Sequence, residues 1–130
     1  MHLVPVPSTL VDQHWQEVEG YVQKACERGP IDGTSTEYLS GCTAGYFQLW
    51  LVRTPDTQTC GVIVTGISKG VLECLILAGE NMTEWSSLLV QIEAWAKDQN
   101  CTKVRAFTRP GMAKRMATYA TRGIIIEKVL

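Results

Sequence analysis

Apolar residues recur along this chain with two different periods. In residues 8–28 the spacing is that of one face of a helix, and the apolar positions are Leu10, Val11, Trp15, Val18, Val22 and Cys26. Gly29-Pro30 is expected to end this helix. A short strand over Leu3–Val6 precedes it, and the two prolines in that stretch confine the strand to the edge of a sheet.

The middle of the chain is typical of strands. β-Branched and aromatic residues dominate three runs, Tyr46–Arg53, Cys60–Ile67 and Val71–Ala78, with turn residues between them. This predicts an antiparallel meander whose last strand is buried on both faces. A further helical turn is predicted over Glu37–Gly41.

After Gly79 the helical period returns. The apolar positions of this second long helix are Trp85, Leu88, Leu89, Ile92, Trp95 and Ala96, with Thr83 as the expected N-cap and Glu84 in the first turn. A strand over 103–107, a helix over 112–121 and a closing strand over 124–129 follow. We therefore expect one α/β (α+β) domain over 1–130, with a mixed central sheet of about six strands and helices on both faces.

Composition narrows the setting of this domain. Hydrophobic residues make up 45% of the 130 positions, which is enough for one core. The cysteine count is odd and no pair has the C-x-x-C spacing, so reduced thiols in the cytoplasm are expected rather than disulfides. The chain begins without the pattern of a signal peptide and has no apolar run long enough for a membrane span. Its two histidines, His2 and His14, are too far apart in sequence to suggest a metal site.

Charge is unevenly distributed. Residues 1–100 hold 5 basic and 12 acidic side chains, whereas residues 101–130 hold 7 basic side chains and only Glu127 as an acid. Such a split suits a phosphate-bearing ligand, a nucleic acid, or an acidic protein surface such as that of a second copy. The net charge of −1 and the absence of a recognition motif argue against nucleic acid. The candidate partner-binding residues are Arg109, Lys114, Arg115 and Arg122.

Three of these cations have an alternative interpretation. Arg109 can hold a phosphate or carboxylate, or it can stabilise the loop that Pro110-Gly111 begins. For Lys114 and Arg115 the alternative is a solvated helix face. A protein partner or self-association is the expectation that remains for the basic segment as a whole.

The order of elements resembles the GNAT (N-acetyltransferase) superfamily. The segment from Arg109-Pro110-Gly111-Met112 through Tyr119-Ala120-Thr121-Arg122-Gly123-Ile124 is similar to that family's C-terminal end, in which a helix carries a tyrosine four residues before a glycine. Gln48-Leu49-Trp50, Val62–Gly66 and 92–96 also resemble the GNAT-like proteins of tailed phages. The resemblance implies an acetyl-CoA cofactor if the protein is active, and a cytoplasmic or virion location if it is phage-encoded.

The resemblance also implies roles for individual residues. Tyr119 matches the family's general acid, although a helix tyrosine packed on the last strand is the alternative. Leu77, Gly79, Asn81 and Thr83 correspond to the cofactor-binding segment. Glu73 is the one acid on an otherwise apolar strand. A buried carboxylate there would have a raised pKa suited to a general base, unless it reaches solvent or pairs with a lysine.

The expected pyrophosphate loop departs from the family pattern. The family's version is Gln/Arg-x-x-Gly-x-Gly/Ala, whereas this chain reads Gly79-Glu80-Asn81-Met82-Thr83-Glu84. Two carboxylates near a pyrophosphate repel it. Two classes of function follow. One is a non-catalytic structural or binding component that keeps the scaffold, for example in a tailed-phage particle, and the other is an active acetyl-CoA-dependent N-acetyltransferase that uses Tyr119 as the acid.

Overall fold

The computed structural model describes residues 1–80 and 85–130. Five strands form one mixed sheet in the order β1-β2-β3-β4-β5, with bounds His2–Val6, Phe47–Arg53, Thr59–Ser68, Val71–Gly79 and Lys103–Ala106. The strands β1 to β4 pair antiparallel, and β4 pairs parallel with β5. The predicted meander and the edge position of the first strand are confirmed.

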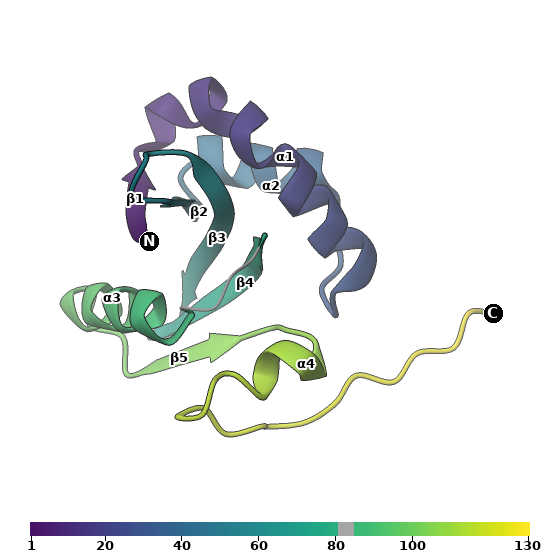
Figure 1. Ribbon diagram of the computed structural model, residues 1–130. Coiled ribbons are helices and arrows are strands. Elements are labelled where there is room, and N and C mark those ends of the chain that lie inside the picture. Colours follow the sequence, from purple (N-terminus) through teal and green to yellow (C-terminus); the bar gives the residue numbers. More distant parts are fainter. Residues whose placement is uncertain (81–84) are drawn as a thin grey trace.

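Helices cover both faces of this sheet (Figure 1). The 3-10 turn η1 (Ser8–Leu10), α1 (Val11–Arg28) and α2 (Ser35–Thr43) lie over one face, and α3 (Trp85–Asp98) lies over the other. None of the helices in the described part of the chain is long and apolar enough to cross a membrane. The prediction of helices on both faces is confirmed, and α2 is longer than the single turn that the sequence suggested.

Alternation along the strands divides the core into two layers. Side chains on one face pack under α1 and α2, and they include Leu49, Leu51, Val62, Val64 and Ile76. The other face packs against α3 and includes Trp50, Val52, Ile63, Leu72 and Cys74. Burial of these apolar side chains, which are 0–7% exposed, is the main source of stability.

The β3–β4 hairpin closes through Lys69 and Gly70. Their φ angles are 53° and 76°, the left-handed values that a two-residue hairpin turn with a right-handed twist requires. Further along this hairpin, Val64 faces Ile76 whereas the next residue, Thr65, faces Cys74. Leu75 is therefore an extra residue in β4, and it forms a β-bulge.

Thr65, beside this bulge, is a buried polar residue whose hydroxyl is fully used. It accepts a hydrogen bond from the Trp50 indole N–H at 3.0 Å and donates one to the Gln48 side-chain oxygen at 2.9 Å. The chain Trp50–Thr65–Gln48 thus satisfies three polar groups next to the irregular part of the sheet.

The sequence prediction fails at the C-terminal end. The helix expected over 112–121 is only α4 (Pro110–Ala113), after which the chain continues in tight turns, with the Met116 N–H bonded to Ala113 and the Tyr119 N–H bonded to Met116. These i→i+3 turns bring Met116, which is 4% exposed, and Tyr119 against the core on the α3 side. Tertiary packing has overridden the helical pattern.

The closing strand expected over 124–129 is also not formed. Residues 120–130 have no regular structure and are exposed, and the chain runs away from the sheet (Figure 1). A strand needs a neighbouring strand for its backbone hydrogen bonds, and this segment has none within the described residues of the single chain. The sheet therefore has five strands rather than about six.

Two helix glycines give a matched test of this packing. A Cβ at Gly41 in α2 would overlap the ring of Phe47, whereas a Cβ at Gly20 in α1 would meet nothing within 4 Å. We predict that Gly41→Ala lowers the free energy of unfolding by about 1–3 kcal/mol through overpacking. The control Gly20→Ala should raise it by roughly 0.5–1 kcal/mol through helix propensity. Urea unfolding of both variants measures this, and equal effects would contradict the packing described.

Candidate functional site

The site begins where β4 and β5 separate. The two strands are in register from Val71–Lys103 to Cys74–Ala106, and the Phe107 N–H still bonds to the Cys74 carbonyl at 3.1 Å. Beyond that point β4 continues to Gly79 paired with β3 alone. The bulge at Leu75 bends β4 directly after the last residue that pairs with β5. One edge of β4 from Leu75 onward is therefore free of a neighbouring strand among the described residues.

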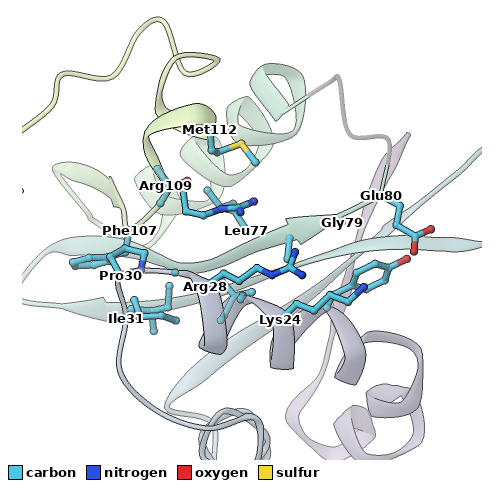
Figure 2. Close-up of a pocket in the computed structure, with 17 residues that line it drawn as sticks. Lys24, Arg28, Pro30, Ile31, Leu77, Gly79, Glu80, Phe107, Arg109 and Met112 are labelled. Atoms are coloured by element: carbon cyan, nitrogen blue, oxygen red, sulfur yellow. The ribbon is translucent and has the colours of Figure 1, made fainter. Parts of the chain in front are cut away.

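The gap between the two strands is a cleft of about 220 Å³. The end of α1 and the loop after it, the free part of β4 and the segment 107–112 line this cleft (Figure 2). Its volume is below the roughly 300–1,000 Å³ of pockets that enclose a whole small molecule. The cleft is thus sized for one end of a ligand rather than for all of it.

Three cations and one acid lie at this cleft. Lys24 and Arg28 come from the last turns of α1, and Arg109 comes from the segment before α4; Figure 2 shows all three side chains around the opening. Glu80, at the end of β4, is the acid among the lining residues, and Ile31, Leu77, Phe107 and Met112 give apolar surface between these charges. The site therefore combines an apolar floor with a rim of net positive charge, which favours an anionic ligand.

Glu80 affects the cleft through its backbone N–H and through the charge of its carboxylate. Its backbone N–H donates to the Cys60 carbonyl at 2.9 Å, which extends the β3–β4 pairing by one residue. The N–H of this residue is therefore already used and is not available to a phosphate. Burial raises the pKa of the Tyr21 phenol, and the charge of Glu80 raises it further.

The two predicted catalytic residues do not line the cleft. The Tyr119 hydroxyl donates a hydrogen bond of 2.8 Å to the Glu93 carboxylate on α3. Burial raises the pKa of Tyr119, and so do the hydrogen bond and the charge of Glu93. Glu73 faces Arg105 across the β4–β5 pairing at 3.8 Å, so it pairs with an arginine rather than with the lysine that the sequence analysis considered. Both residues hold structural contacts, and the structure does not bring them together at the cleft.

The other predicted residues fall into three groups. Leu77, Gly79 and Arg109 line the cleft. Asn81 and Thr83, the second of which is also the predicted N-cap of α3, lie outside the described residues. Lys114, Arg115 and Arg122 are exposed and are not among the lining residues; the Arg115 carbonyl accepts a hydrogen bond from the Ser86 hydroxyl at 3.4 Å.

Sequence reasoning missed Lys24, Arg28 and Phe107. Lys24 and Arg28 are four residues apart and therefore lie on the same side of α1, a signal that the sequence carried. Which element that side faces was not readable from the spacing, because it depends on how α1 crosses the sheet. Phe107 was assigned to a strand, whereas β5 ends at Ala106.

Comparison with solved structures identifies the fold. One similar structure is an aminoglycoside acetyltransferase from an uncultured soil metagenomic sample in complex with sisomicin, with a TM-score of 0.70 and 7% identity over 98% of this chain and 94% of that chain. Another is a tetramutant of the BH1408 protein from Bacillus halodurans, with a TM-score of 0.70 and 12% identity over 100% of both chains.

A third similar structure holds a cofactor. The aminoglycoside N-acetyltransferase AAC(6')-Iy in complex with CoA has a TM-score of 0.64 and 11% identity, over 98% of this chain and 93% of that chain. No family model and no curated protein matches this sequence. The fold is that of the GNAT acetyltransferases, as the order of elements predicted, and at these identities the likeness concerns the fold alone.

The Tyr119–Glu93 contact makes a prediction about alkaline pH. A tyrosine whose pKa is raised by folding keeps its proton in the folded state at a pH where the unfolded chain has lost it. Stability is therefore intact below about pH 10, the ordinary tyrosine pKa, and falls as pH rises through the raised value. We predict that Tyr119→Phe reduces the loss of unfolding free energy between pH 9.5 and 11.

The control for this experiment is Tyr46→Phe, because Tyr46 is 77% exposed. It should leave the pH dependence as in the wild type. Chemical denaturation at several pH values measures both slopes. If the Tyr119→Phe slope equals that of the wild type, Tyr119 is neither buried nor bonded to Glu93 in solution as described.

Proposed function

We propose that this protein is a non-catalytic member of the GNAT fold that works as a structural or binding component. The observation that carries the proposal is the position of its candidate catalytic groups. Tyr119 is bonded to Glu93, Glu73 is paired with Arg105, and neither lines the cleft. A general acid or base must reach the reacting group within hydrogen-bond distance, directly or through one water.

The segment after β4 supports the same proposal. A phosphate-binding turn works by pointing free backbone N–H groups at the ligand. The N–H of Glu80 is bonded to Cys60, and its carboxylate adds a negative charge to the lining. In sequence, Gly79 is the only glycine of this segment and Glu84 is a second acid. We infer that the cofactor loop is degenerate.

An active acetyl-CoA-dependent N-acetyltransferase is the second candidate, and the cleft itself favours it. An unpaired strand edge offers hydrogen bonds to an extended amide chain, and acetyl-CoA carries such a chain. The cationic rim of Lys24, Arg28 and Arg109 suits its phosphates or an anionic acceptor. The same rim would repel a polycation, so the aminoglycoside named for two of the similar structures is not expected as an acceptor here.

Binding of acetyl-CoA separates the two candidates. Because a ligand that binds only the folded state raises its melting temperature, an active enzyme should show a concentration-dependent shift. We predict no shift for the wild type at millimolar acetyl-CoA beyond that of inorganic pyrophosphate at the same ionic strength. Pyrophosphate is the matched control because its negative charge is attracted by the same cations, Lys24, Arg28 and Arg109. A saturable shift specific to acetyl-CoA would overturn the non-catalytic proposal.

We further infer that the protein acts in a tailed-phage particle or in the cytoplasm of the host cell. The support is the resemblance of Gln48-Leu49-Trp50, Val62–Gly66 and 92–96 to the GNAT-like proteins of tailed phages, together with the basic segment 101–130, which suits a protein partner or a second copy. We predict peptides of this chain in purified particles of the phage that encodes it. Particles free of the chain, with the protein found only in the lysate, would contradict a virion role.

A further inference from the structure

A second pocket lies at the end of the sheet opposite to the cleft. The strand β1 pairs with β2 only as far as Val6, which lies opposite Leu49, so the first two residues of β2 extend beyond the end of β1. At this end Phe47 lies opposite Gly66 of β3, which in turn pairs with the first half of β4, whereas the cleft uses β4 from its bulge onward. The two sites therefore share no lining residue.

This β1–β2 pocket is uncharged and large enough for a whole small molecule. It is lined by residues 5–8 at the end of β1, by Gly45 and residues 47–50 at the start of β2, and by Trp95 of α3. Its volume of about 370 Å³ is within the roughly 300–1,000 Å³ of ligand pockets. None of these lining residues carries a charge, so a charged ligand would lose its hydration without gaining a counter-charge. The pocket therefore fits a neutral molecule.

Aromatic rings form the main surface of the pocket. Trp50 and Trp95 pack edge to face, with their ring centroids 5.3 Å apart and their planes at 79°. Phe47 adds a third aromatic ring, and Pro5 and Pro7 add rigid walls. Because the face of an aromatic ring carries partial negative charge, it attracts the slightly positive C–H groups of a ligand. The two tryptophans hold each other in place, so this surface exists before a ligand arrives.

Gln48 supplies a hydrogen-bond donor whose orientation is fixed. The Trp50 indole N–H can only donate, so the Thr65 hydroxyl accepts from it. Thr65 is fully buried, and its own proton therefore needs an acceptor, which is the Gln48 side-chain oxygen at 2.9 Å. The oxygen of the Gln48 amide is thereby turned toward Thr65 and its NH2 group away from it. Among the described residues this NH2 group has no hydrogen-bond partner, and Gln48 lines the pocket.

Rings, donor and neutrality together restrict the class of ligand. A purely apolar molecule would cover the Gln48 NH2 group without pairing it, which is unfavourable. A nucleotide would bring phosphate, for which the lining residues hold no cation. A neutral sugar offers C–H groups for the ring faces, a hydroxyl oxygen that accepts from Gln48, and a second hydroxyl for Ser8 at the rim.

We propose that the β1–β2 pocket binds a neutral sugar. The sugar ring packs on the tryptophan pair, and the Gln48 NH2 group donates to one of its hydroxyl oxygens. A free sugar and the terminal unit of a glycan present the same chemistry to this pocket. The inference does not depend on the non-catalytic proposal, because that proposal concerns the cleft beside β4. Failure of one therefore leaves the other standing.

The first test is calorimetric titration of the full chain with a panel of sugars. The panel holds methyl glycosides of glucose, galactose, mannose and N-acetylglucosamine, and at least one of them should bind saturably. The uronic acid and the amino sugar with the same ring should bind about 10-fold more weakly, since the lining offers no counter-charge. A tetrasaccharide that binds more tightly than the single sugar identifies a glycan end as the ligand, whereas equal affinity identifies a free sugar.

The second test replaces the donor and keeps the fold. Gln48→Glu retains the oxygen that accepts from Thr65 and exchanges the NH2 group for a carboxylate oxygen, which cannot donate. It should weaken binding of the sugar about 10-fold, the loss expected for one hydrogen bond. Gln58→Glu is the matched control, because it makes the same change of charge at an exposed position between β2 and β3. Its affinity should equal that of the wild type.

Nuclear magnetic resonance locates the bound sugar. The indole N–H signals of Trp50 and Trp95 should shift on titration, and that of Trp15, which packs under the other face of the sheet, should not. The proposal is wrong if no neutral sugar of the panel binds saturably, or if Gln48→Glu binds as tightly as the wild type. A proline-rich peptide that shifts the Trp50 and Trp95 signals when none of the sugars does would overturn it as well.

Discussion

The separation of β4 from β5 is the constraint on which the rest of this structure depends. The two strands pair from Val71–Lys103 to Cys74–Ala106, and the extra residue Leu75 then turns β4 away. Because β4 stays paired with β3, its other edge has no neighbouring strand over the last part of its length. The end of α1 and the segment 107–112 close around that edge and form the cleft. A straight β4 would have continued the pairing with β5 and left no cleft.

The same separation sets the cleft apart from the groups that were expected to act as acid and base. The cleft keeps a free strand edge and a cationic rim, which are features of binding. The groups expected to act as acid and base are held elsewhere, Tyr119 by Glu93 on α3 and Glu73 by Arg105 on β5. A fold specifies where a ligand can lie, whereas activity depends on which side chains reach it.

The sequence was sufficient for most of the architecture. The helical spacing of Trp15, Val18 and Val22 and the strand runs around Trp50 and Val64 are long and regular, and local pattern and tertiary packing agree there. The pattern misled at the C-terminal end. Residues 112–121 have a helical appearance, but burial of Met116 and the Tyr119–Glu93 bond favour tight turns. Residues 124–129 have the composition of a strand, but no strand among the described residues pairs with them.

The site was less predictable than the fold for a physical reason. Leu77, Gly79 and Arg109 were found because they lie in segments that adjoin the gap. The cations Lys24 and Arg28 come from a helix far away in sequence, and no local pattern states which part of the sheet a helix end will face. The pairing of Glu73 with Arg105 needed the β4–β5 register, which the sequence alone does not give.

The central claim is the non-catalytic role that we propose for this cleft. The most direct test offers the protein acetyl-CoA together with small, peptide or acidic amines as acceptors. Chromatography then measures the release of free CoA. The account predicts that the rate with the protein equals the rate in buffer for every amine. Turnover that depends on the protein and is lost in Tyr119→Phe or Glu73→Gln would contradict it.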